Sequence, residues 1–168
     1  MALLLKMVKC MIKDKKMIID IIMVIAVAIA PLIFIGFFLN DNERIKKIDI
    51  SNVEEITEKV EYNIDDIYIE NTQVIIWGWA LYEDQNIINR KILLQNVDDK
   101  QEVYELNTAM LTRDDLNETF DGELNNRGGF WANGKIDKRI KNKKFEIVIL
   151  FNENESKILH TGRIWSLE

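Results

Sequence analysis

The stretch from Gln73 to Glu83, with the sequence QVIIWGWALYE, constrains the fold more than any other part of the chain. β-branched and aromatic residues dominate it and polar residues flank it, a pattern that predicts a β-strand. Because side chains alternate between the faces of a strand, Trp77 and Trp79 share one face and Gly78 lies on the other. Gly78 leaves room there for another ring or backbone to approach. Both faces are apolar, so we expect this strand to be packed between two layers.

A second stretch predicts a membrane anchor. The nineteen residues from Ile21 to Leu39 carry no charge, and Met17 to Ile19 extend the run. About 20 apolar residues cross a ~30 Å hydrocarbon core as a helix, so residues 17–39 are predicted to span a lipid bilayer. A cleaved signal peptide is the alternative, because Ala28 and Ala30 form an A-x-A pattern. That pattern lies in the middle of the run and Pro31 follows it, so we favour an uncleaved anchor.

Charge is distributed unevenly along the chain. The formal net charge is −6, whereas residues 1–20 contain five lysines and two aspartates, a net of +3, so the remainder carries −9. Lysines are retained on the cytoplasmic side of a span, which predicts a single-pass protein of the cell membrane with a cytoplasmic N-terminus and an extracytoplasmic C-terminal domain. An acidic domain argues against nucleic acid as a partner.

These observations divide the chain into four parts. Residues 1–16 form a basic cytoplasmic leader, 17–39 the transmembrane helix, 40–61 a charged connector and 62–168 the extracytoplasmic domain. In the connector, Ser51 and Glu54 form a capping-box pattern that predicts a short helix as far as Lys59. The single cysteine, Cys10, lies in the leader, so the stability of the domain is expected to come from packing.

Residues 62–168 show short apolar runs separated by polar turns about every ten residues, which is typical of an antiparallel sandwich. We therefore predict an all-β domain, an immunoglobulin-like antiparallel β-sandwich of about seven strands. Residues 107–127 interrupt the rhythm with a polar segment, which is either a crossover between sheets or a functional loop.

Five short motifs carry a resemblance to a known group of proteins. They are GWA at 78–80, RDDL at 113–116, GF at 129–130, FEIVI at 145–149 and TGR at 161–163. In these motifs the domain resembles small β-sandwich ectodomains of bacterial membrane-anchored cell-envelope proteins, which are associated with surface polysaccharides and teichoic-acid-like polymers. The resemblance implies an extracytoplasmic binding or accessory module without catalytic residues.

The aromatic residues are the first candidates for ligand contacts. Trp79, Tyr82 and Trp131, together with Trp77 and Trp165, could form a platform on which sugar rings stack. The alternative is that these large rings fill the core of the sandwich.

The charged candidates are Arg113, Asp114 and Arg163. Either arginine could bind a carboxylate or phosphate as a bidentate fork. The alternative for Arg113 is an ion pair with Asp114 or Asp115 that fastens the segment after residue 107 to the sheet.

Catalytic and metal-binding patterns are not apparent. His160 is the only histidine, the serines lie in no nucleophile motif, and a hydrolase that uses Asp114 and Asp121 is suggested by spacing alone. We therefore expect no catalytic residues, metal or cofactor. The expected function is a non-catalytic module that binds or organises a cell-envelope glycopolymer or its biosynthetic complex. The alternative is a protein–protein adaptor subunit of a larger membrane complex. The expected partners are thus the lipid bilayer and either cell-wall polysaccharide or a membrane protein of the envelope machinery.

Overall fold

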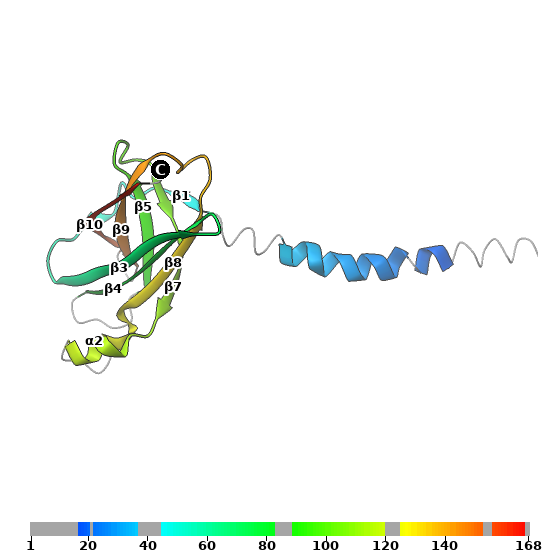
Figure 1. Cartoon of the computed structure of the whole chain (residues 1–168), viewed down its shortest axis with the longest axis horizontal. Coiled ribbons are helices and arrows are strands. Elements are labelled where there is room, and N and C mark those ends of the chain that lie inside the picture. The colour runs from blue at the N-terminus through cyan, green and yellow to red at the C-terminus, as the bar shows by residue number, and fades with distance from the viewer. Residues whose placement is uncertain are drawn as a thin grey trace, which may run out of the picture. The chain divides into compact units, whose positions relative to one another are not determined.

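The protein consists of an apolar helix and a separate compact β-domain (Figure 1). The computed structural model describes residues 17–20, 22–36, 45–82, 89–119, 125–152 and 156–166. One compact unit comprises Met1–Asn42 and the other Glu43–Glu168. The predicted leader, residues 1–16, lies outside the described residues, as does Asp121.

The helix extends from Met17 to Gly36, and its 20 residues are long and apolar enough to cross a membrane. At 1.5 Å per residue it is about 30 Å long, which matches a hydrocarbon core. The last three residues of the predicted span, 37–39, lie outside the described residues.

The β-domain is built from two sheets. The first sheet has the strand order β1-β6-β5-β9-β10-β2 and the second has the order β3-β4-β8-β7. The strands of the first sheet are β1 (Lys46–Ile48), β6 (Val103–Glu105), β5 (Asn89–Asn96), β9 (Lys144–Asn152), β10 (Lys157–Ser166) and β2 (Glu54–Glu55). Those of the second are β3 (Val60–Glu70), β4 (Gln73–Tyr82), β8 (Gly129–Lys135) and β7 (Asn107–Leu111). Neighbouring strands are antiparallel except β10 and β2, which are parallel.

The main core lies between the two sheets. The second sheet contributes Val74, Ile76 and Ala80 of β4 and Phe130 of β8, and the first sheet contributes alternate residues of β5 and β9. The inner residues of β5 and β9 are Ile92, Leu94, Phe145, Ile147, Ile149 and Phe151. The strand predicted over residues 73–83 is therefore confirmed as β4, which is a central strand of its sheet.

Gly78 is the point of closest approach inside this core. A Cβ atom at residue 78 would lie 2.7 Å from Cζ of Phe130 and closer still to the carbonyl oxygen of Asn63. Both neighbours belong to strands that pair with β4, so neither can withdraw without moving the sheet. Only glycine fits at this position, so the predicted close approach of a ring and of another backbone at Gly78 is confirmed.

The short helix expected in the connector is wrong. Residues 45–61 contain the strands β1 and β2 instead. The apolar residues of this segment are used for packing at strand-like intervals: Ile45 and Ile56 join the main core, while Ile48 and Ile50 pack on a second apolar cluster on the other side of the first sheet. Burial of these side chains outweighs the local capping-box signal, because isolated short helices are marginally stable in water.

The domain predicted over residues 62–168 contains eight strands among its described residues, β3 to β10, where about seven were expected, and β1 and β2 precede it. The strands β1, β2 and β7 are each five residues or shorter. β7 also resolves the alternatives for residues 107–127, because β6 belongs to the first sheet and β7 to the second. The chain therefore crosses between sheets at Leu106, whose N–H donates to the carbonyl of Ile92 at 2.9 Å.

One carboxylate connects the turn after β5 to the segment before β9. The Glu102 side chain accepts hydrogen bonds from Nζ of Lys143 at 2.6 and 2.7 Å, from the hydroxyl of Tyr104 at 2.7 Å and from the amide of Asn96. Burial alone would raise the pKa of Glu102, but these donors outweigh it and lower the pKa to about 2.

Replacing Gly78 by alanine is expected to destabilise the domain by about 1–3 kcal/mol, because the added methyl group overpacks the core. Unfolding of the full chain in detergent micelles, followed by tryptophan fluorescence, would measure the change. Gly162→Ala is the comparison. An added Cβ atom there meets no atom within 4 Å, so this variant measures the effect of backbone strain at φ +65° without overpacking. Equal stability of Gly78→Ala and the wild type would contradict the packing.

Replacing Glu102 by glutamine is expected to lower stability at pH 7 by about 1–3 kcal/mol. A carboxylate whose pKa is depressed on folding stabilises the protein above its unfolded value, 4.5, and this stabilisation is lost as the pH falls towards about 2. The difference between variant and wild type should therefore shrink between pH 5 and pH 2.5 in urea unfolding. Glu105→Gln is the control, because its pair with Lys91 lies near the surface and should matter less. A pH-independent difference would argue against the assignment.

Candidate binding face

The face of the second sheet that points away from the core, here called the outer face, carries a row of aromatic side chains. Trp77 of β4 is paired with Trp131 of β8, and their ring centroids lie 6.4 Å apart with planes inclined at 70°. On the other side, the indole N–H of Trp77 donates to the hydroxyl of Tyr68 on β3 at 3.2 Å. Tyr68, Trp77 and Trp131, here called the aromatic row, thus extend across three adjacent strands (Figure 1).

The aromatic row is accessible to solvent. Trp77 is 39% exposed and Tyr68 36% exposed, and Trp131 is half-buried. The described core clusters contain none of these three side chains, so the alternative that Trp77 fills the core is wrong. Trp79 is half-buried on the same face, and only Trp165 of the four tryptophans packs against the main core. Trp77 and Trp79 are outside because they alternate along β4 with Ile76, Gly78 and Ala80, which face the core.

Arg113 lies across the same face at one end of the aromatic row. Its Cγ atom packs where a side chain at Gly129 would be, and its guanidinium pairs with Asp65 of β3 at 2.5 Å and with Asp115 at 2.8 Å. The hydrogen bonds to Asp115 and Asp65 raise the pKa of Arg113, and Arg113 lowers the pKa of Asp115. The guanidinium therefore fastens the end of β7 to β3, as the alternative for this residue predicted.

The helix α2 (Asp114–Thr119) covers one end of the outer face. Leu116 of α2 is 3% exposed, and both Leu116 and Leu81 of β4 approach the Cβ position of Gly128 within 3 Å. Asp114, a predicted ligand contact, is exposed in the first turn of α2, where a negative charge suits the helix dipole. The helix protects Leu81 and leaves Trp77 uncovered.

Amide side chains lie at the opposite end of the outer face. The Nδ2 atom of Asn133 donates to Oε1 of Gln73 at 3.0 Å. Asn133 is 8% exposed, and its Oδ1 atom accepts no hydrogen bond from any residue in the described part of the chain. Because that oxygen atom is buried, a ligand on the surface cannot reach it, and the half-buried Gln73 is the member of the amide pair that reaches solvent.

The structure brings together some of the predicted contacts and separates others. Trp79, Trp131 and Arg113 share the outer face, and Asp114 follows Arg113 directly. Tyr82 lies in the main core, where it packs on Phe151 and accepts a hydrogen bond from Lys157 at 3.0 Å, so it cannot join the platform. Arg163 is exposed on β10 of the other sheet.

Sequence reasoning missed Tyr68 and the neighbouring Asp65 and Asp66. Their placement depends on the register of β3 on β4, which shifts between Ile64 and Asp66. Alternation within β3 alone could not locate this bulge, because it is defined by the pairing of the two strands.

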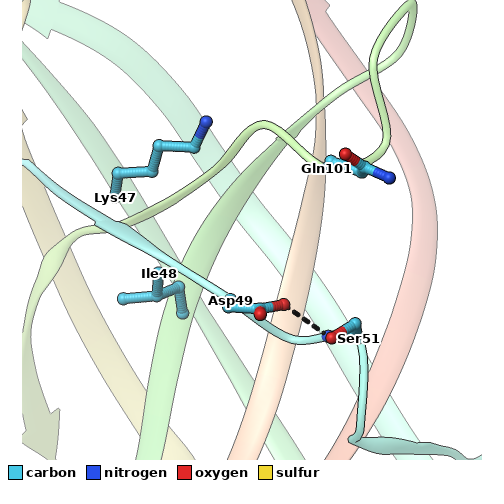
Figure 2. Close-up of a pocket in the computed structure, with 5 residues that line it drawn as sticks. All are labelled: Lys47, Ile48, Asp49, Ser51 and Gln101. Carbon is cyan, nitrogen blue, oxygen red and sulfur yellow. Dashed lines mark hydrogen bonds between the residues drawn. The ribbon is translucent and has the colours of Figure 1, made fainter.

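A second surface lies beside the first sheet, where a pocket of ≈ 560 Å³ is lined by Lys47, Ile48, Asp49, Ser51 and Gln101 (Figure 2). Asp49 accepts a hydrogen bond from the N–H of Ser51 at 2.9 Å, and this turn lowers the pKa of Asp49. Figure 2 shows four of these side chains along residues 47–51 and Gln101 on the segment before β6, and they do not converge on a point. The pocket is a gap between turns and offers no set of groups for chemistry.

The neighbouring carboxylate, Glu146, is 9% exposed and fully engaged. Its oxygens contact the N–H of Gly162 at 3.0 Å, Nζ of Lys100 at 3.2 Å and Nδ1 of His160 at 3.3 Å. Burial raises the pKa of Glu146, but these partners outweigh it and lower the pKa. His160 is thus a strand residue that supports a bend in β10. In the part of the chain that the structure describes, no group of three or more His, Cys, Asp or Glu side chains could hold a metal ion.

Comparison of the chain with models of known protein families gives no match, and comparison with curated proteins gives none either. The functional interpretation therefore depends on the outer face itself.

Trp77 is expected to dominate quenching of the intrinsic fluorescence by acrylamide. Trp77→Phe should lower the Stern–Volmer constant of the full chain more than Trp165→Phe, because Trp165 packs against the core. Fluorescence titration in detergent micelles measures both. A larger effect of Trp165→Phe would mean that the aromatic row is covered in solution.

Proposed function

We propose that this protein is a membrane-anchored, non-catalytic module whose outer face binds a glycan chain of the bacterial cell envelope. In this proposal the helix Met17–Gly36 is an uncleaved anchor with its N-terminus in the cytoplasm, and the β-domain is an extracytoplasmic, immunoglobulin-like sandwich. The observation that carries the proposal is the aromatic row on the solvent side of the sheet.

The chemistry of the row suits a sugar chain. Pyranose rings have apolar C–H faces that pack on aromatic rings, and their hydroxyl groups require hydrogen-bonding side chains nearby. Trp77 and Trp131 supply the rings, and Gln73, held by a hydrogen bond from Asn133, supplies an amide group at one end of the row. The aromatic row runs across three neighbouring strands, which suits an extended ligand better than a compact one.

A protein–protein adaptor is less well supported. An adaptor that accepts a strand from its partner needs an open, uncharged sheet edge. The edge strand β3 has a bulge at Asp65 and carries Glu61, Asp66 and Glu70, features that oppose strand addition. The other edge strand of this sheet, β7, is uncharged, and only its length of five residues opposes strand addition there.

The test is binding of solubilised envelope polysaccharide to the full chain in lipid nanodiscs, which avoids sugar-based detergents. Trp77→Ala and Trp131→Ala should each weaken binding by about tenfold or more, because central aromatic contacts commonly contribute over 1 kcal/mol. Trp165→Phe is the matched control on the other sheet and should bind like the wild type. Equal binding by all four proteins would locate the ligand elsewhere, and no binding by the wild type would refute the proposal.

A further inference from the structure

We propose that the outer face selects uncharged polysaccharide and discriminates against polymers that carry phosphate or carboxylate groups. This inference rests on the glycan binding proposed above and specifies the chemical class of the ligand. Its basis is the charge that surrounds the aromatic row.

The outer face is acidic. Its strand positions, together with the ion pair of Arg113, hold five carboxylates against two cations, a net charge of −3. The carboxylates are Glu61, Asp65, Asp66, Glu70 and Asp115, and the cations are Arg113 and Lys135. This negative field would repel an anionic chain that lies along the row, whereas it would not repel a neutral chain.

The bulge in β3 concentrates the negative charge beside the rings. Asp66 is paired with Trp77, and the extra residue Asp65 points to the same face, where it accepts a hydrogen bond from Asn63 at 2.7 Å. Two consecutive carboxylates therefore lie on one face, which regular alternation would not allow. Asp66 is exposed, and its Oδ1 atom accepts a hydrogen bond from the N–H of Ile67 at 2.8 Å, which fixes its place next to Trp77.

The cations on this face do not offset that field at the row. Arg113 is bound by two carboxylates, so the trio with Asp65 and Asp115 is itself negative. Lys135 is paired with Gln73, four residues along β8 from Trp131, or roughly 13 Å at the rise of a strand. Glu70 is paired with the same Gln73, so the charges of Glu70 and Lys135 offset each other at that end of the face. The negative charge nearest Trp77 is therefore that of Asp66 and of the trio around Arg113.

The same charge argues against other occupants. The surface of a bilayer with anionic lipids is negative and would repel this face. A protein partner would need a basic patch to match it, and such a partner would displace rather than accompany the polysaccharide. An uncharged chain is the occupant that uses the rings without an electrostatic penalty.

The experiment uses the full chain in nanodiscs of zwitterionic lipid. Envelope polysaccharide is separated on an anion-exchange resin into a fraction that passes through and a fraction that is retained. We expect the neutral fraction to bind with an affinity that changes little between about 50 mM NaCl, where charges are weakly screened, and about 300 mM NaCl, where they are strongly screened. The anionic fraction should bind about tenfold more weakly or worse at the lower salt, and the gap should narrow as salt screens the repulsion.

The variant Asp66→Asn combined with Glu70→Gln is expected to reduce the ratio of neutral to anionic affinity by about two- to fivefold. The matched variant Asp98→Asn combined with Asp99→Asn removes two carboxylates from the turn after β5, on the other sheet, and should leave the ratio unchanged. A second readout needs no polysaccharide. Each ion's quenching of the fluorescence that Trp77→Phe removes is divided by its quenching of free N-acetyltryptophanamide, and this ratio should be higher for caesium than for iodide.

The outcomes separate the two proposals. Binding of the anionic fraction that depends on Trp77 and equals or exceeds neutral binding would overturn the charge inference and leave glycan binding intact. Equal normalised quenching by iodide and caesium would also overturn it. Failure of both fractions to bind would refute the proposed function as well. So would binding of a basic protein by an outer face that binds neither fraction.

Discussion

The contact between Gly78 and Phe130 is the constraint on which the rest of the domain depends. Phe130 fills the space that a side chain at residue 78 would occupy, between two sheets whose inner residues are fully buried. Next to Gly78, the inner side of β4 has no room for a large ring, and the ring of Tyr82 enters the core only at the end of the strand. The same glycine that closes the core therefore places Trp77 and Trp79 outside, on a surface that the protein leaves uncovered.

Side chains cover only one end of the outer face and leave the aromatic row exposed. Leu116 of α2 protects Leu81 at one end, and Arg113 lies over Gly129 to reach Asp65 on the far edge strand. These contacts do not extend to Trp77 in the middle of the sheet. Aromatic side chains of this size are usually buried or in contact with a partner, since each can remove 150–250 Å² from water. An exposed row of them is therefore a cost to the free protein that a ligand would offset.

Electrostatics adds selectivity to this apolar surface. An exposed aromatic surface accepts many sugars, because every pyranose presents C–H groups to a ring. In the proposed binding mode, the carboxylates brought together by the β3 bulge would exclude anionic sugars by charge, without touching the ligand at the rings. Stacking would then provide affinity, and the acidic border would provide discrimination between neutral and anionic chains.

The sequence by itself determined the local features: an apolar helix long enough for a bilayer, the main strands and the face of β4 on which each side chain lies. These follow from hydrophobic length and from the alternation of side chains, which neighbouring residues define without reference to the rest of the chain. Only the tertiary structure decided which face of β4 is the core, because the other sheet must pack on one of them. It likewise decided that residues 46–48 and 54–55 are strands, since their partners lie in β6 and β10. The pairing of Arg113 with Asp65, 48 residues apart, and the bulge that aligns Asp65 with Asp66 depend on strand register. Register is a relation between distant segments, and no pattern within either segment specifies it.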